Sequence, residues 1–350
     1  MKKIIQIIIL VLSIITIVFV YNDDFLYSSP IMKITEIETI NEDVSQNTLG
    51  LKEKYYTRKL IGVLTNTKNK GNKKEVEYEE SYSSVVTDKY RIGDKVIIDG
   101  NDINLKRDIY LILMILIFVN LIYIVGSYKG LLSIVSVILN LIIFYIGLVL
   151  YFKGVNLLLL SIIEMIIFSI LSLILASGIN KKTLSAIISV IISMMVMLIL
   201  LLIVVKLTNY KGINFNELSF LTIPVEDIII PELLIGSVGA IMDVAITISS
   251  SVSELIDKDK KISKKALNKS AKEIGKDIMS TMSNVLFFTY LCAGLPIFVL
   301  ALRNGFSMYN YISNNFTLEL SRFLIGSIGI IITIPISAFI SIKLMKRGAE

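Results

Sequence analysis

The chain has 350 residues, of which 54% are hydrophobic and 18% are charged, and its mean hydropathy is +0.75. Soluble domains are roughly 45–50% apolar, so the excess indicates surface that faces lipid. Cys292 is the one cysteine and there is no His, which excludes an intrachain disulfide and histidine-based metal sites. We expect no metal site and no cofactor, and any proton chemistry falls to carboxylates.

Eight apolar runs are long enough for a membrane-spanning helix, which needs about 20 residues. They cover 4–20, 109–126, 131–151, 155–177, 183–205, 228–252, 278–302 and 319–342. The first run could instead be a secretory signal peptide, because Lys2 and Lys3 precede it. Residues 21–24 offer no small-residue cleavage site, however. The prediction is an all-α polytopic membrane protein of about eight transmembrane helices.

Basic residues set the expected orientation, because short cytoplasmic loops carry an excess of Lys and Arg. A cytoplasmic N-terminus places most of them inside, including the basic loop 257–277. It leaves five basic residues in the short outer loops: Lys153, Lys206, Lys211, Arg303 and Arg322. We therefore expect a cell-membrane protein with both termini in the cytoplasm. The net charge of +6 then indicates anionic phospholipid rather than nucleic acid as the partner.

Three domains follow from this pattern. Residues 1–20 are an N-terminal transmembrane anchor, 21–106 a β-rich extracytoplasmic domain, and 107–350 a seven-helix transmembrane domain. In the outer domain, 59–64 and 75–82 resemble strands, 68–74 resembles a turn, and 90–99 resembles a tight turn followed by a β run. We expect a small β-barrel or sandwich that binds a ligand or partner, or that serves only as a structural cap.

Polar residues form a stripe along the run 228–252 and just beyond it. Steps of four and three place them on one helical face: Gly236, Ala240, Asp243, Thr247, Ser250 and Glu254. A charge at the centre of a spanning helix costs about 2.5–3.5 kcal/mol, so Asp243 is the leading candidate for a functional site. Small residues such as Gly236 and Gly239 allow another helix to approach, and helix packing is the alternative for the glycines and serines.

A second polar face is expected where the run 278–302 begins, with Asp277, Thr281 and Asn284 on one side of the helix. Hydroxyl and amide groups there could pair with the stripe around Asp243. Glu164 lies near the middle of the run 155–177 and fits either function or packing.

Two further features concern packing and charge in the run 319–342. Gly326 and Gly329 repeat the spacing of Gly236 and Gly239 and predict close helix packing. Glu319 and Arg322 are three residues apart and are expected to pair at the outer boundary.

The basic segment 257–277 has its own pattern. Ile262, Ala266, Ala271, Ile274 and Ile278 fall near one helical face, and the lysines lie mostly elsewhere. This pattern predicts an amphipathic helix on the inner leaflet, capped by Ser263 and bound to anionic lipid. A solvated cytoplasmic loop is the alternative.

These residues resemble a known family. The stretch 236–255 (GSVGAIMDVAITISSSVSEL), the basic segment and 274–284 (IGKDIMSTMSN) are similar to YibE/F-like membrane proteins. So are the GDKV turn at 93–96, the Lys106-Arg107 pair and the GSIG motif at 326–329. Two positions depart from that pattern, with Ser280 where Gly is expected and Val285 where Thr is expected. The resemblance implies a polytopic bacterial membrane protein and supplies no reaction.

The order around Gly239 and Asp243 also resembles, by analogy, the proton-relay segment of resistance–nodulation–division and SecD/SecF-type permeases. Our leading hypothesis is a permease for a small solute or ion, coupled to protons through Asp243. A non-transporting envelope scaffold or sensor is the alternative, and either could assemble with copies of itself or with a related membrane protein. We expect no enzyme, since only a close pair of Glu164 and Asp243 would resemble a catalytic dyad.

Overall fold

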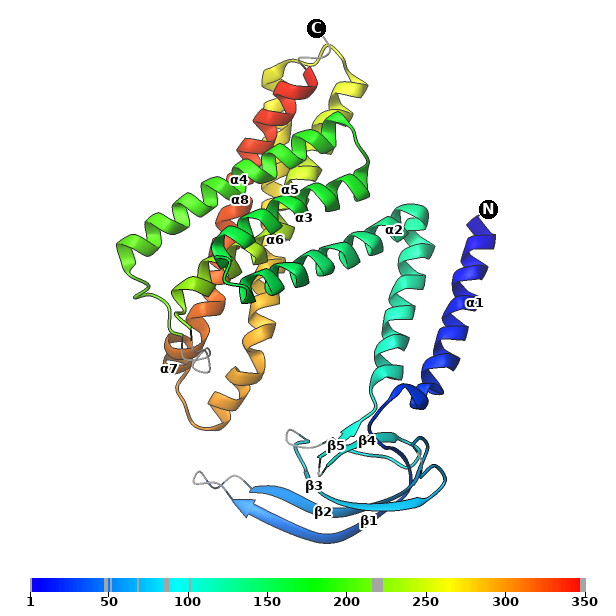
Figure 1. Ribbon diagram of the computed structural model, residues 1–350. Coiled ribbons are helices and arrows are strands. Elements are labelled where there is room, and N and C mark those ends of the chain that lie inside the picture. The colour runs from blue at the N-terminus through cyan, green and yellow to red at the C-terminus, as the bar shows by residue number, and fades with distance from the viewer. Residues whose placement is uncertain are drawn as a thin grey trace. The chain divides into compact units, whose positions relative to one another are not determined.

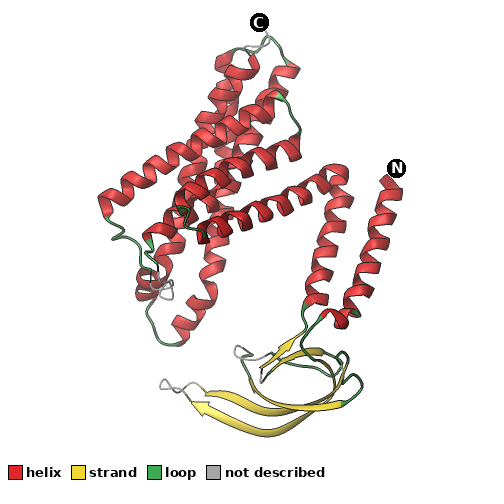
Figure 2. Cartoon of the chain, viewed as in Figure 1, coloured by secondary structure: helices red, strands yellow, loops and turns green. Residues whose placement is uncertain are grey.

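The computed structural model describes residues 2–46, 50, 52–67, 69–84, 88–100, 102–215 and 223–346. It divides into two compact units, Met1–Leu131 and Leu132–Glu350. Figure 2 shows that the described strands all belong to the first unit and that the second is helical.

Seven helices in the described part of the chain are long and apolar enough to cross a membrane (Figure 1). They are α1 (Lys2–Tyr21), α2 (Asp108–Phe152), α3 (Leu157–Ser177), α4 (Lys181–Thr208), α5 (Glu226–Lys258), α6 (Lys264–Arg303) and α8 (Thr317–Lys346). The shorter helical turns are η1 (Asp23–Leu26), α7 (Met308–Tyr311) and η3 (Ile312–Phe316).

The expected count was eight, and the difference lies in α2. This helix has 45 residues, which corresponds to about 68 Å, more than twice the ~30 Å hydrocarbon core. It contains both the run 109–126 and the run 131–151. Between them the backbone of Ser127 leaves the helical region, with φ 51° and ψ −134°. The two predicted spans therefore exist as two parts of one long element.

The first unit holds a five-stranded antiparallel sheet in the order β3-β2-β1-β4-β5. The strands are β1 (Ile31–Gln46), β2 (Lys52–Leu64), β3 (Lys73–Ser81), β4 (Lys95–Asp99) and β5 (Asp102–Leu105). The strands expected at 59–64 and 75–82 and the β run after Gly93 are confirmed. The expected barrel or two-sheet sandwich is wrong, because the described strands form one sheet whose ends, β3 and β5, each have a single neighbour.

The sheet has a small core because β1 and β2 each contribute alternate apolar residues to one face. Met32, Ile34, Leu60 and Val96 are at most 1% exposed and pack with Tyr78 and Tyr90, whose rings meet edge to face. Register shifts in β1 at Ile34/Glu36 and Thr39/Asn41 interrupt its pairing with β2. Such bulges increase the local twist of a strand, and the sheet is visibly curved (Figure 1).

In the second unit α5 packs against α3, α4 and α8, and α6 packs mainly against α8. The glycines of α8 explain the close approach. A Cβ added at Gly329 would lie 2.7 Å from Ile241 Cδ1, and one added at Gly326 would lie 2.9 Å from Leu286 Cδ1. The predicted packing role of both glycines is confirmed.

The basic segment 257–277 is not a separate surface helix. Ser263 caps it, its Oγ accepting a hydrogen bond from the N–H of Ala266 at 3.1 Å, and the helix then continues without interruption to Arg303. Leu267 and Ala271 are fully buried in a core shared with α5 and α8. Because residues 264–277 are the first part of α6, the side of this segment that carries Leu267 and Ala271 meets protein rather than a lipid leaflet.

Candidate functional site

The polar stripe of α5 lies on an exposed face of the second unit. Asp243, Thr247 and Glu254 are exposed, as are Gly236 and Gly239, whereas Ala240 and Ser250 are half-buried. A Cβ added at Gly236 would lie 3.2 Å from the Tyr290 hydroxyl of α6, and one added at Gly239 would meet nothing within 4 Å. Another helix therefore approaches the stripe at Gly236, whereas Gly239 has no close neighbour and Asp243, Thr247 and Glu254 remain exposed.

The opposite face of α5 explains this arrangement. Val244, Ile248 and Val252 are fully buried against α6 and α8, and Ile241 and Ala245 are fully buried against α3 and α4. With about 100° of rotation per residue, Asp243 and Thr247 lie on the side of α5 that faces away from these buried residues. The sequence thus places an aspartate on the surface of a helix that is otherwise suited to hydrocarbon.

The second predicted polar face, on α6, is also exposed, and it does not meet the first. Asp277, Thr281 and Asn284 are exposed, and the Thr281 hydroxyl donates to the carbonyl oxygen of Ile278 at 3.0 Å. On α5 the Thr247 hydroxyl donates to the Asp243 carbonyl oxygen at 2.7 Å. In the described ranges no hydrogen bond or ion pair joins the two polar faces, so the pairing suggested by the sequence is not observed within one chain.

Glu164 occupies a different environment. It is 6% exposed, and Oε1 of its carboxyl lies against Gly147 of α2, in the space that a Cβ would take. No described hydrogen bond connects Glu164 with Asp243, which lies on an exposed face. The two acids are therefore not arranged as a hydrogen-bonded dyad.

A half-buried charge cluster joins α5 to α8. Arg322 donates hydrogen bonds to Glu319 Oε1 and to Glu232 Oε1, and its side chain is 18% exposed. The pair of Glu319 and Arg322 was predicted and is confirmed. Glu232 was missed, because its partner is 90 residues away in the sequence and only the packing of α5 on α8 brings them together.

Buried hydroxyls form a second cluster that the sequence reading missed. All are fully buried, and they come from α4, α5 and α8: Ser185, Ser189, Ser193, Ser249, Thr333, Ser337 and Ser341. The hydroxyl of Ser341 is 2.9 Å from that of Ser249 and 3.3 Å from that of Ser185. The sequence does contain a sign of this cluster: the hydroxyl residues of α4, and likewise those of α8, are four residues apart, a spacing that aligns side chains on one helical face. Such contacts join membrane helices closely.

Lys106 forms the third missed cluster, in the first unit. Its ammonium group donates to Asp23 and to Asp24 Oδ1 (3.0 Å) and lies 3.3 Å from Asp108 Oδ2. Burial alone would lower the pKa of Lys106, but the hydrogen bonds to Asp23 and Asp24 raise it overall. At Asp24, burial alone would raise the pKa of the carboxyl. The hydrogen bonds from Lys95 and Lys106 outweigh burial and hold this pKa below its usual value.

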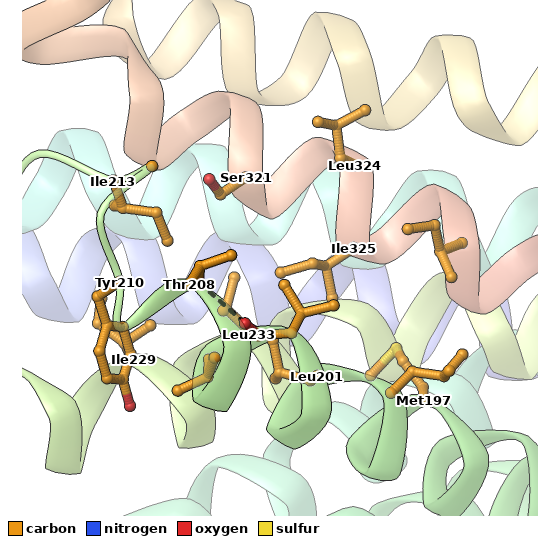
Figure 3. A pocket seen from close by; sticks show the side chains of 15 residues that line it. Met197, Leu201, Thr208, Tyr210, Ile213, Ile229, Leu233, Ser321, Leu324 and Ile325 are labelled. Carbon is orange, nitrogen blue, oxygen red and sulfur yellow. Dashed lines mark hydrogen bonds between the residues drawn. The ribbon is translucent and has the colours of Figure 1, made fainter.

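A lateral cavity of about 300 Å³ opens between α4, α5 and α8 (Figure 3). Its wall is apolar apart from the hydroxyls of Thr208, Tyr210 and Ser321. The described residues contain no group of three or more Asp, Glu or Cys side chains that could hold a metal ion.

These observations define a mainly helical protein that has an N-terminal antiparallel sheet. Seven of its described helices are long and apolar enough to cross a membrane, and Asp243 lies on the exposed face of one of them. The chain belongs to the YibE/F-like family: the model described as YibE/F-like protein matches residues 114–347. The model described as YibE/F family N-terminal domain matches residues 25–110, which contain the sheet. Neither the comparison with curated proteins nor that with solved structures returned a match.

Proposed function

We propose that the chain is a multi-pass membrane permease for a small solute or ion, coupled to protons through Asp243. The observation that carries the proposal is the exposed position of Asp243 on α5, within an open face of small and hydroxyl residues. Ionised Asp at such depth costs about 2.5–3.5 kcal/mol, so this face must meet water, a polar solute or another polar protein surface.

The proposed topology places the chain in the cell membrane. If the two parts of α2 cross separately, the helices make eight crossings, and this even number keeps both termini on one side of the membrane. The excess of basic residues in 257–277 favours the cytoplasm for that side, with the sheet outside. The lysines at the start of α6, including Lys264, Lys265 and Lys272, are exposed and would then lie near anionic lipid of the inner leaflet. A second copy or a related membrane protein could cover part of the polar faces.

The test is proton-coupled flux. Full-length protein carrying Asp243→Asn is reconstituted in proteoliposomes, and flux of candidate ions and small solutes is followed under an imposed pH gradient. The matched control is Asp257→Asn, which changes an exposed acid in the last turn of α5. We expect coupling to be lost only in the first variant. Unchanged coupled flux with Asp243→Asn contradicts the proposal.

A second candidate function, an envelope scaffold or sensor, is favoured by the shape of the sheet. β1 pairs with β4 only at Ile31–Lys33, whereas its pairing with β2 continues to Gln46. From Glu38 to Gln46 every residue of β1 is exposed, including Ile40 and Val44. A protruding arm with exposed apolar residues is suited to partner binding. On this hypothesis Ile40→Lys with Val44→Lys abolishes cross-linking to envelope partners, whereas Ile92→Lys, at another exposed position, leaves it unchanged.

A further inference from the structure

The lateral cavity described above has a buried floor and an apolar mouth. Met197, Leu201, Ile229 and Leu233 form the floor and are at most 6% exposed. The mouth is flanked by exposed pairs one helical turn apart, Leu200 with Val204 on α4 and Leu324 with Ile328 on α8. Figure 3 shows Leu324 and Ile325 of α8 on the far side of the cavity from Met197 and Leu201 of α4. The cavity thus opens sideways through the apolar surface of two span-like helices.

An apolar cavity of this size is unfavourable for water, which needs two to four polar partners. Two of the three hydroxyls in the wall already donate to their own helices: Thr208 to Val204 (2.9 Å) and Ser321 to Thr317 (2.7 Å). About 300 Å³ is at the lower end of ordinary ligand pockets. The mouth is continuous with the apolar outer surface of α4 and α8. A hydrocarbon chain can therefore enter the cavity from that surface without first losing bound water, which a polar ligand would have to do.

One end of the cavity is basic. α4 ends at Thr208, and Asn209 and Tyr210 both adopt left-handed backbone conformations (φ 47° and 58°) that turn the chain across the end of the cavity. Lys211 lies between the lining residues Tyr210 and Gly212, and Lys206 follows the lining residue Val205. Both lysines are exposed, so the segments that form this end of the cavity carry two positive charges next to lining residues in the sequence.

We propose that this cavity binds an anionic phospholipid, with one acyl chain against Met197, Leu201 and Leu233 and the phosphate near Lys206 and Lys211. The proposal stands apart from Asp243 and from proton coupling. The apolar wall accounts for the chain, and the attraction of two positive charges for a phosphate accounts for a preference for negative headgroups. In the expected orientation both lysines lie on the outer side, so the lipid is one of the outer leaflet. A tyrosine at this level, with an apolar ring and a polar hydroxyl, fits the boundary between acyl chains and headgroups.

The probe is phosphatidylglycerol with a photoreactive diazirine in its acyl chain, present as a tracer in phosphatidylcholine vesicles that contain the full-length protein. After illumination, adducts are mapped by mass spectrometry. We expect adducts on the floor residues Met197, Leu201 and Leu233, which bulk lipid cannot reach. Adducts confined to outward-facing residues such as Leu202 and Ile331 would overturn the proposal.

Two sets of variants sharpen the test. Ser321→Phe fills the cavity from α8 and should reduce floor adducts at least tenfold, whereas Ile331→Phe, on an exposed position of α8 outside the cavity, should leave them unchanged. Lys206→Gln with Lys211→Gln should reduce the preference for phosphatidylglycerol over a phosphatidylcholine probe by about fivefold for each lysine. The proposal is overturned if the phosphatidylglycerol and phosphatidylcholine probes label the floor residues of the unmodified protein equally. This comparison does not depend on whether the Ser321→Phe variant folds.

Discussion

The ammonium group of Lys106 lies 3.0 Å from Asp24 Oδ1, and this contact joins the segment between β5 and α2 to the turn after α1. Asp23 and Asp108 approach the same ammonium group, and Lys95 of β4 is 2.7 Å from the other oxygen of Asp24. The Lys106 side chain is 3% exposed. Charges so well buried depend on one another, because the loss of any one leaves another without compensation.

Lys106→Met should therefore destabilise the sheet and its attachment to α1 and α2. Removing one partner of a buried ion pair costs about 3–5 kcal/mol, and we expect amide exchange of β1 and β4 to accelerate accordingly in hydrogen-exchange mass spectrometry of the full chain. The control is Lys54→Met, since Lys54 and Glu42 form an exposed pair (53% and 47%) worth at most about 1 kcal/mol. Equal protection in both variants would contradict the structural role of Lys106.

The same cluster sets the pH range over which the first unit is stable. The pKa of Asp24 is lowered in the folded protein, so its contribution is complete above the unfolded value of about 3.9 and is lost as the pH falls through the folded value. The pKa of Lys106 is raised, so its contribution is complete below about 10.4 and is lost as the pH rises through the folded value.

We therefore expect protection of β1 and β4, corrected for intrinsic exchange rates, to be constant between about pH 5 and 9 and to decrease below about pH 4. Lys106→Met with Lys95→Met should weaken the acid decrease, because Asp24 then lacks the donors that lower its pKa. An acid decrease of unchanged size in this double variant would show that other carboxylates are responsible.

The sequence predicts the helices well because each reflects a local property, a run of apolar residues about as long as the bilayer core is thick. It also predicts the Glu319–Arg322 pair, whose residues lie one helical turn apart. Glu232 and Lys106 could not be assigned in this way, since their partners are 90 and 82 residues away. A small barrel or sandwich was expected from strand signals alone, which do not determine how the strands of a sheet are ordered or whether its edge strands meet.

For the basic segment 257–277, the sequence predicts a helical face but not what that face contacts. Its apolar residues do lie on one helical face, as predicted, but periodicity does not reveal whether that face meets lipid or protein. Burial of Leu267 and Ala271 against α5 and α8 shows that it meets protein. Similarly, the polar stripe around Asp243 was identified from spacing, whereas its exposure depends on how α5 packs.

Gly147 offers a test of the environment of Glu164. An added Cβ would overlap the Glu164 carboxyl, so Gly147→Ala should displace this buried side chain and destabilise the second unit by about 1–3 kcal/mol. Detergent unfolding followed by circular dichroism measures the change. The control is Gly126→Ala, also in α2, where an added Cβ meets nothing within 4 Å and helix propensity favours alanine. Equal loss of stability in the two variants would show that Glu164 does not fill this space.

The last prediction concerns the pair that joins α5 to α8, Glu232 with Arg322. A double-mutant cycle with Glu232→Gln and Arg322→Met, in which Glu319 is unchanged throughout, isolates their coupling. Because Arg322 is 18% exposed and Glu232 35%, we expect about 1–3 kcal/mol in detergent unfolding, as for residues in one ion-pair network. The reference cycle is Glu273→Gln with Lys276→Met, an exposed pair within α6 (59% and 65%), for which at most about 0.5 kcal/mol is expected. A coupling between Glu232 and Arg322 no larger than the reference would mean that this ion pair does not help to hold α5 against α8.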